Sequence, residues 1–278
     1  MTAWNSGEVE VDGLRLHYTR TGGEKPPVVL AHGVTDDGPC WTPIAEALSD
    51  DYDLIMVDAR GHGRSDAPEE GYGPDLQAND LAGVIRALGL TKPAVIGHSM
   101  GAATTLVMAG TFPDLPGAIV LEDPPTWWLP ADTGGDEQRR AGMLEWFSAI
   151  KRQTNAELLA GIRQNQPGWS DVEVQTWVES KQRFSPNVLG LLRHGASAHI
   201  DWTETLGRIT CPATLIYADP ERGGIVTAEA AEALRAIIPQ LHVEHIAGAG
   251  HNIRRDQPER FLQLVRAALA EWTAGVPV

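Results

Sequence analysis

Short apolar runs alternate with amphipathic stretches along the first part of the chain. The runs are rich in β-branched side chains and have the length of strands, and the stretches between them repeat apolar residues at helical spacing. The runs are residues 9–11, 14–18, 28–31, 54–57, 94–96 and 119–121, and the predicted helices are residues 43–48, 75–88 and 100–112. This alternation predicts an α/β fold with a mostly parallel sheet flanked by helices.

The pattern changes between residues 124 and 206. This part shows no convincing strand, is divided by Pro and Gly into helical segments, and holds six of the nine tryptophans, Trp127, Trp128, Trp146, Trp169, Trp177 and Trp202. Strand and helix patterns resume at residues 213–217, 227–238, 241–246 and 258–272. We therefore predict an α/β core domain of residues 1–124 and 207–278, with a helical cap of residues 125–206 inserted after the sixth strand.

Composition and charge narrow the class of protein. The 278 residues are 42% apolar and 21% charged, which is typical of a compact globular chain. The formal charge of -15 favours repulsion from nucleic acid and anionic lipid, so we expect neither as a partner. No apolar stretch is long enough to cross a bilayer and the first residues lack an export signal. We expect a cytoplasmic protein in which Cys40 and Cys211 are free thiols.

A serine stands between a predicted strand and a predicted helix in the sequence Gly97-His98-Ser99-Met100-Gly101. In that context G-x-S-x-G forms a nucleophile elbow, a tight turn that strains the serine backbone while the glycines let neighbouring chain pass closely. The alternative is a Gly-Ser turn that only packs a helix on a strand. We predict that Ser99 is a catalytic nucleophile.

Two other parts of the sequence can supply the oxyanion hole and the general base that such a nucleophile needs. The backbone N–H groups of Val34, just after a predicted strand, and of Met100 are placed to form an oxyanion hole. His251 follows the last predicted strand and can reach over the carboxyl edge of the sheet as the general base. His32 and His98 lie at strand ends, where we expect them to brace loops.

These motifs, in this order, resemble those of α/β-hydrolase-fold proteins of the esterase, lactonase and carbon-carbon hydrolase kind. The motifs are His32-Gly33, Asp58-x-Arg60-Gly61-His62-Gly63-x-Ser65, Gly97-x-Ser99-x-Gly101 and Gly250-His251. The resemblance covers the chain outside residues 125–206 and implies that fold with a triad of serine, histidine and acid. A serine at position 99 argues against the dehalogenase and epoxide hydrolase branches, for which the resemblance would require aspartate. We interpret the loop from Asp58 to Asp66 as a structural turn.

The resemblance leaves the triad acid open between two places. In this family the acid usually follows the seventh strand, three residues before a valine, but counting back from Val226 reaches Gly223. Asp219 or Glu221 can serve only if a two-residue insertion is accommodated. In lactone hydrolases similar to the zearalenone-opening enzymes the acid follows the sixth strand, and here Asp123 lies at that edge of the sheet. We favour Asp123, with Asp219 and Glu221 as the alternative.

The residues after the sixth strand suggest an apolar pocket. Trp127 and Trp128, four and five residues after Asp123, are the predicted lining, although both could instead belong to the core of the helical segment. Asp36 and Asp37 either border the same pocket or lie in a solvated loop.

No metal or cofactor is predicted. His242 and His245 face opposite sides of a predicted strand, and His194 and His199 are five residues apart, which separates them around a helix. The sequence Gly61-x-Gly63 lacks the third glycine of a dinucleotide loop.

We predict a serine hydrolase of a small hydrophobic ester or lactone. Two alternatives stay open: a carbon-carbon bond hydrolase with the same triad, and a ligand receptor on a hydrolase fold with slow turnover.

Overall fold

The computed structural model describes residues 4–129, 135–192 and 199–275. Eight strands form one sheet in the order β1-β2-β4-β3-β5-β6-β7-β8; β3 to β8 are parallel, and β1 and β2 are antiparallel strands at one edge. The strands are β1 (Asn5–Val11), β2 (Leu14–Arg20), β3 (Pro27–Ala31), β4 (Asp53–Val57), β5 (Ala94–His98), β6 (Ala118–Glu122), β7 (Ala213–Tyr217) and β8 (Leu241–His245). This is the mostly parallel sheet that the sequence predicted.

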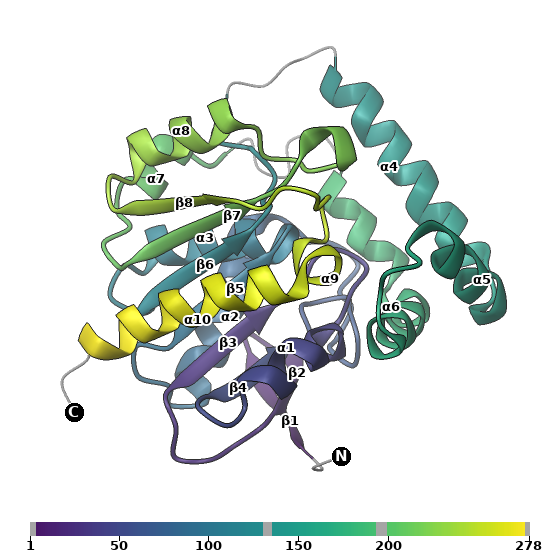
Figure 1. Cartoon of the computed structure of the whole chain (residues 1–278). Helices are drawn as coiled ribbons and strands as arrows, with labels where there is room; N and C mark the ends of the chain where they lie inside the picture. Colours follow the sequence, from purple (N-terminus) through teal and green to yellow (C-terminus); the bar gives the residue numbers. More distant parts are fainter. Residues whose placement is uncertain (1–3, 130–134, 193–198, 276–278) are drawn as a thin grey trace.

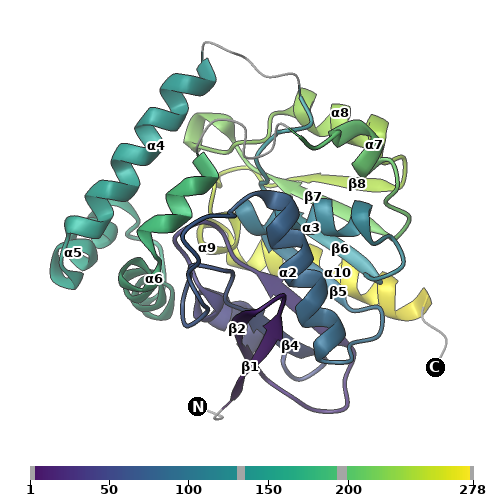
Figure 2. The same ribbon diagram turned by 180° about the vertical axis from the view of Figure 1, so that it is seen from behind.

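Helices cover both faces of the sheet. α1 (Thr42–Leu48) and α10 (Pro258–Gly275) pack on one face, in front of the sheet in Figure 1. α2 (Pro74–Ala87), α3 (Met100–Thr111) and α8 (Ala228–Ile237) pack on the other, with α2 and α3 in front in Figure 2.

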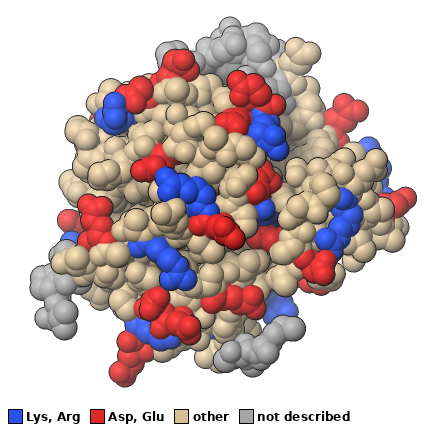
Figure 3. Space-filling view, in the orientation of Figure 1, with Lys and Arg blue, Asp and Glu red and all other residues tan. Residues whose placement is uncertain are grey.

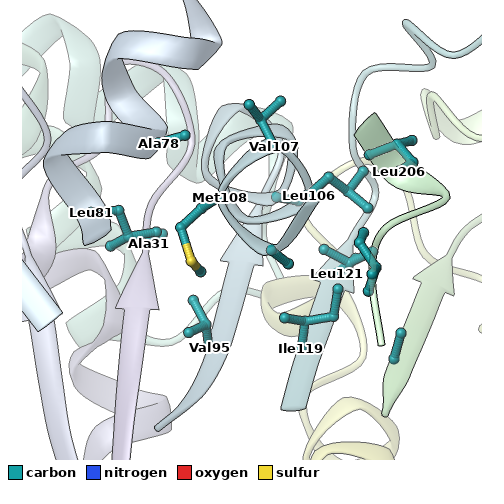
Figure 4. Close-up of a cluster of buried hydrophobic side chains, with 14 of the residues drawn as sticks. Ala31, Ala78, Leu81, Val95, Leu106, Val107, Met108, Ile119, Leu121 and Leu206 are labelled. Carbon is teal, nitrogen blue, oxygen red and sulfur yellow. The ribbon is translucent and has the colours of Figure 1, made fainter. Parts of the chain in front are cut away.

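Successive residues of each central strand enter opposite cores, because side chains alternate across a strand. In β5, Val95 packs under α3, whereas Ile96 belongs to the core on the opposite face. Figure 4 shows the first of these cores, where Val95 and Ile119 of the sheet meet Leu106 and Met108 of α3. Both faces are thus buried, and the carboxyl ends of the parallel strands are left at one edge to carry polar residues.

The chain between β6 and β7 is helical where the structure describes it, and those residues contain no strand. The elements are α4 (Gly135–Arg152), α5 (Asn155–Asn165), α6 (Asp171–Arg183), the 3-10 helix η2 (Pro186–Leu192) and α7 (Trp202–Leu206). α4, α5 and α6 lie together to one side of the sheet (Figure 1) and share a small apolar core, whereas α7 packs with α3 through Leu206. The domain boundaries at residues 124 and 207 stay a prediction.

Three short helices were not predicted from the sequence pattern. They are η1 (Gly38–Trp41), η3 (Pro220–Arg222) and α9 (Ile253–Asp256). Each is about one turn long, which is too short to show a periodic signal. α9 begins two residues after His251, the predicted general base.

The face of the molecule seen in Figure 3 carries charges of both signs. Acidic and basic side chains are interspersed over the face that Figure 3 shows. Within the described residues, no helix combines the length and the apolar character needed to span a membrane. Cys40 and Cys211 are free thiols, as expected, and both are buried.

Candidate active site

Ser99 lies in the tight turn between β5 and α3. Its backbone has φ 52° and ψ -116°, a strained combination for any residue with a side chain. Ser99 N donates to Glu122 O of the neighbouring strand at 2.9 Å, which holds the turn against the sheet. A Cβ on Gly97 would lie 2.5 Å from Gly101 O, and one on Gly101 would lie 2.2 Å from Ala31 O, so neither glycine can carry a side chain. The turn therefore has the geometry of a nucleophile elbow.

The loop after β3 runs beside Ser99. A Cβ on Gly33 would lie 3.2 Å from Ser99 Cβ, so the backbone here approaches the serine closely. Val34 packs in one apolar cluster with Met100, the first residue of α3. The N–H of a first helical residue has no partner within its helix, so the Met100 N–H is available to a bound oxygen. Both residues expected to form the oxyanion hole thus belong to segments that meet at Ser99.

His251, in the loop after β8, donates a hydrogen bond from Nδ1 to Asp123 Oδ2, 2.6 Å away. Asp123 directly follows β6 and is fully buried, whereas the His251 side chain is 28% exposed, so the imidazole and not the carboxylate can meet a substrate. Ile225 N donates to both carboxylate oxygens, at 2.9 and 3.1 Å, and Val226 N donates to Oδ1 at 3.0 Å. These donors fix the carboxylate, and the Nδ1–H tautomer leaves Nε2 free to accept a proton.

The alternative acids belong to a separate turn after β7. Asp219 accepts hydrogen bonds from Gly248 N at 2.7 Å and from His245 Nε2 at 2.8 Å. The Gly248 N–H is the main cause that lowers the pKa of Asp219. Glu221 lies in the exposed η3 turn. The fold therefore brings Asp123, rather than Asp219 or Glu221, to His251.

The two tryptophans after Asp123 have different surroundings. Trp127 packs against Trp202, with ring centroids 5.7 Å apart, and borders the apolar cluster that contains Met100. Trp128 is buried against α8, where its Nε1 donates to Ala230 O at 3.0 Å. Trp127 thus lies beside the cluster that contains Met100, whereas Trp128 has the contacts of a core residue. The pocket role of both tryptophans stays a prediction.

Buried histidines brace the loops around the elbow. His98 Nε2 donates to His251 O at 3.0 Å, and burial holds the pKa of His98 well below its usual value. His32 Nε2 accepts from Ala59 N at 3.0 Å. Burial lowers the pKa of His62 to about 3. The rings of His98 and His62 are therefore neutral at physiological pH. Their hydrogen bonds are to the backbone, for His98 to His251 O and for His62 to Arg60 O and Thr35 N.

The loop after β4 is held by contacts to other elements, in keeping with a structural turn. Asp58 accepts from Gly38 N at 2.7 Å and from Arg64 N at 2.9 Å. Arg60 forms a buried ion pair with Asp80 of α2. Asp58 and Arg60 therefore pair with groups other than Ser99.

Sequence reasoning missed a set of charges buried beside the site. Asp36 accepts from Lys181 Nζ at 2.6 Å and from Arg255 Nη2 at 2.9 Å, and Asp37 accepts from Arg183 Nε at 2.6 Å. The solvated-loop alternative for the two aspartates is therefore wrong. Their partners come from distant parts of the chain, so no local spacing could have revealed them.

The family model of the alpha/beta hydrolase fold matches residues 26–254. The chain belongs to this family. This alpha/beta hydrolase-fold protein is 30% identical over 261 residues to N-formylmaleamate deformylase of Pseudomonas putida, with 92% of each chain covered. It is 28% identical over 269 residues to 2-(acetamidomethylene)succinate hydrolase of Mesorhizobium japonicum, with 94% of this chain and 93% of the relative covered. The crystal structure of E-2-(acetamidomethylene)succinate hydrolase is similar with a TM-score of 0.82 at 25% identity, over 96% of this chain and 100% of that chain.

Proposed function

We propose that the protein is a serine hydrolase that cleaves a small hydrophobic carboxylic ester or lactone. The observation that carries this proposal is the hydrogen bond of 2.6 Å between His251 Nδ1 and Asp123 Oδ2, in a chain whose Ser99 occupies a nucleophile elbow. The bond selects the tautomer in which Nε2 can act as a base. Ser99, His251 and Asp123 are the proposed triad, and Val34 and Met100 are the proposed oxyanion donors.

In the proposed reaction, Ser99 Oγ attacks the carbonyl carbon while His251 Nε2 takes the hydroxyl proton. The N–H groups of Val34 and Met100 stabilise the oxyanion. His251 then gives the proton to the leaving oxygen, the ester C–O bond breaks, and an acyl-enzyme forms. Water, deprotonated by His251, attacks this intermediate, the bond from the acyl carbon to Ser99 Oγ breaks, and His251 returns the proton to Ser99 Oγ as the acid leaves. Asp123 stabilises the imidazolium formed in both steps.

An apolar substrate suits the surroundings of the oxyanion hole. The cluster there is made of the buried residues Tyr72, Met100, Val188 and Leu191 and the partly buried residues Val34, Ala59 and Trp127. Val188 and Leu191 belong to η2, so the segment between β6 and β7 contributes to this wall. We therefore propose that this segment acts as a cap that covers an acyl or alcohol group.

An N-acyl amide is the second candidate substrate. The two relatives named above have names that contain an N-acyl group: a formyl group on nitrogen in one and an acetamido group in the other. The same nucleophile, base and oxyanion donors cleave an amide when His251 protonates the leaving nitrogen.

Labelling and turnover test the proposal together. A fluorophosphonate should add once to the native protein, at Ser99, as measured by intact mass and peptide mapping. Ser99→Ala should lose both the label and the turnover of p-nitrophenyl esters, lactones and N-acyl amides. Ser49→Ala, at the end of α1, is the control and should keep both. Labelling at another serine, or full turnover in Ser99→Ala, would contradict the proposal; faster cleavage of the amides would favour the second substrate class.

A further inference from the structure

Six charged side chains are buried around α9, the short helix that begins two residues after His251. This α9 charge cluster consists of Asp36, Glu122, Glu173, Lys181, Arg254 and Arg255, none of them more than 4% exposed. Three are acidic and three are basic, so the charges balance. Buried ion pairs add little net stability, because desolvation offsets their attraction. We therefore ask which segments the cluster holds in place.

Glu122 joins the segment that carries Asp123 to the segment that carries His251. It is the last residue of β6, and its carbonyl oxygen accepts from Ser99 N at 2.9 Å. Its carboxylate accepts from Arg254 N at 2.9 Å and from Arg254 Nη1 at 3.0 Å. Glu122 thus supports the turn of the nucleophile, precedes the proposed acid, and holds the start of the helix that follows the proposed base.

Asp36 ties the loop of the proposed oxyanion hole to the same helix. It lies two residues after Val34 and accepts from Lys181 Nζ at 2.6 Å, Arg255 Nη2 at 2.9 Å and Arg254 Nη2 at 3.2 Å. Burial by itself would raise the pKa of Asp36, but the three cations outweigh burial and hold that pKa well below its usual value. The carboxylate therefore stays ionised and can hold all three cations.

The cluster also reaches α6, which lies beside α9 in both Figure 1 and Figure 2. Glu173 of α6 accepts from Arg255 Nε at 2.9 Å. Just before α6, Trp169 Nε1 donates to Asp256 Oδ1 at 2.9 Å, and Asp256 Oδ2 accepts from Gly250 N at 2.8 Å. The helical segment is therefore bonded to α9, and Asp256 of α9 is bonded in turn to Gly250, the residue before His251.

We propose that Glu122 and Arg254 are positioning residues that hold His251 at the distance and orientation at which it bonds Asp123, an inference that rests on the function proposed above. Glu122 and Asp123 are adjacent at the end of a central strand, so the contact of Arg254 with Glu122 sets the spacing between His251 and Asp123. Glu122→Gln keeps the volume of the side chain but places an amide NH2 group against one of the two Arg254 donors, the backbone N–H or Nη1. Two donors repel each other, so one of the two hydrogen bonds is lost. A misplacement of about 1 Å in such a site lowers kcat by about 10²-fold.

The hydrogen bond between His251 and Asp123 can be observed without turnover. An Nδ1–H proton shared with a buried carboxylate gives a strongly downfield NMR resonance, which is assigned in the full chain by its loss in His251→Gln. Asp53→Asn is the matched control. Asp53 is also buried and accepts from one guanidinium, Arg20 Nε at 2.7 Å, and one backbone group, Gly22 N at 2.8 Å, but it lies at the amino end of β4, opposite the site.

Glu122→Gln is expected to lose or shift the resonance and to lower kcat by about 10²-fold with KM little changed, whereas Asp53→Asn keeps the native resonance and kcat. An unchanged resonance in folded Glu122→Gln overturns the proposal, and so does its loss in both variants. If Glu122→Gln is unfolded at the assay temperature, Arg254→Lys is judged by the same resonance, since it keeps the charge but not the two-pronged contact. If no turnover that depends on Ser99 is found, the proposed function is overturned. The positioning role is still tested, because the resonance is observed without substrate.

Discussion

Replacing Asp123 by Asn removes the charge behind His251 while keeping the shape of the side chain. We expect kcat to fall by about 10⁴-fold, which is about 5.4 kcal/mol in activation free energy. The backbone accepts the change, because Asp123 has a φ of 44° and Asn tolerates this left-handed region as Asp does. Activity should therefore be lost while the fold is kept.

The magnitude follows from the direction in which the new amide must face. Ile225 N and Val226 N are fixed backbone donors that lie 2.9 to 3.1 Å from the carboxylate oxygens. An NH2 group in place of Oδ1 would leave Val226 N without an acceptor, at about 1–3 kcal/mol, and Ile225 N with only one of its two acceptors. The amide oxygen therefore faces the backbone and the NH2 faces His251. The ring must then accept at Nδ1 and carry its proton on Nε2, where it cannot take the proton of Ser99.

The assay is kcat on the best substrate of the panel, with thermal melts to establish folding. Asp219→Asn is the matched control, because Asp219 also bonds an imidazole, that of His245 at 2.8 Å. We expect Asp219→Asn and Glu221→Gln to keep nearly native kcat. A folded Asp123→Asn with kcat within about ten-fold of native would refute the reasoning. A large loss in Asp219→Asn would return the acid to the turn after β7.

Two further predictions concern packing. Cys40 and Cys211 should resist a thiol-reactive dye in the native protein at about pH 8 and react after unfolding. The reason is that burial raises the pKa of Cys40 to about 12 and that of Cys211 to about 11. Rapid labelling of the native protein would contradict this. Gly33→Ala should lower stability by about 1–3 kcal/mol and slow turnover, because its Cβ would lie 2.6 Å from His98 Nδ1. Gly142→Ala, where the Cβ of a helical residue meets open space, should be neutral or slightly stabilising, and equal melting temperatures for the two variants would refute the packing argument.

The sequence by itself determined where the strands and the main helices lie along the chain, and where the turn that carries Ser99 lies. Buried strands appear as short apolar runs and helices as a repeat of three to four residues, so each signal lies within one element. The elbow needs only Gly97, Ser99 and Gly101 between such a run and such a repeat. These features were predictable because neighbours along the chain produce them.

Only the tertiary structure decided which side chains meet. The spacing of residues favoured Asp123 over Asp219, but only the fold shows that Asp123 is hydrogen-bonded to His251. The two residues are 128 positions apart in the sequence. Arg254 and Asp36 are 218 residues apart and leave no pattern in the sequence between them. Their contact depends on strand order and on the paths of two loops over the sheet edge. Periodicity within an element cannot encode such a meeting, because the pairing arises only after the sheet has brought its strand ends together.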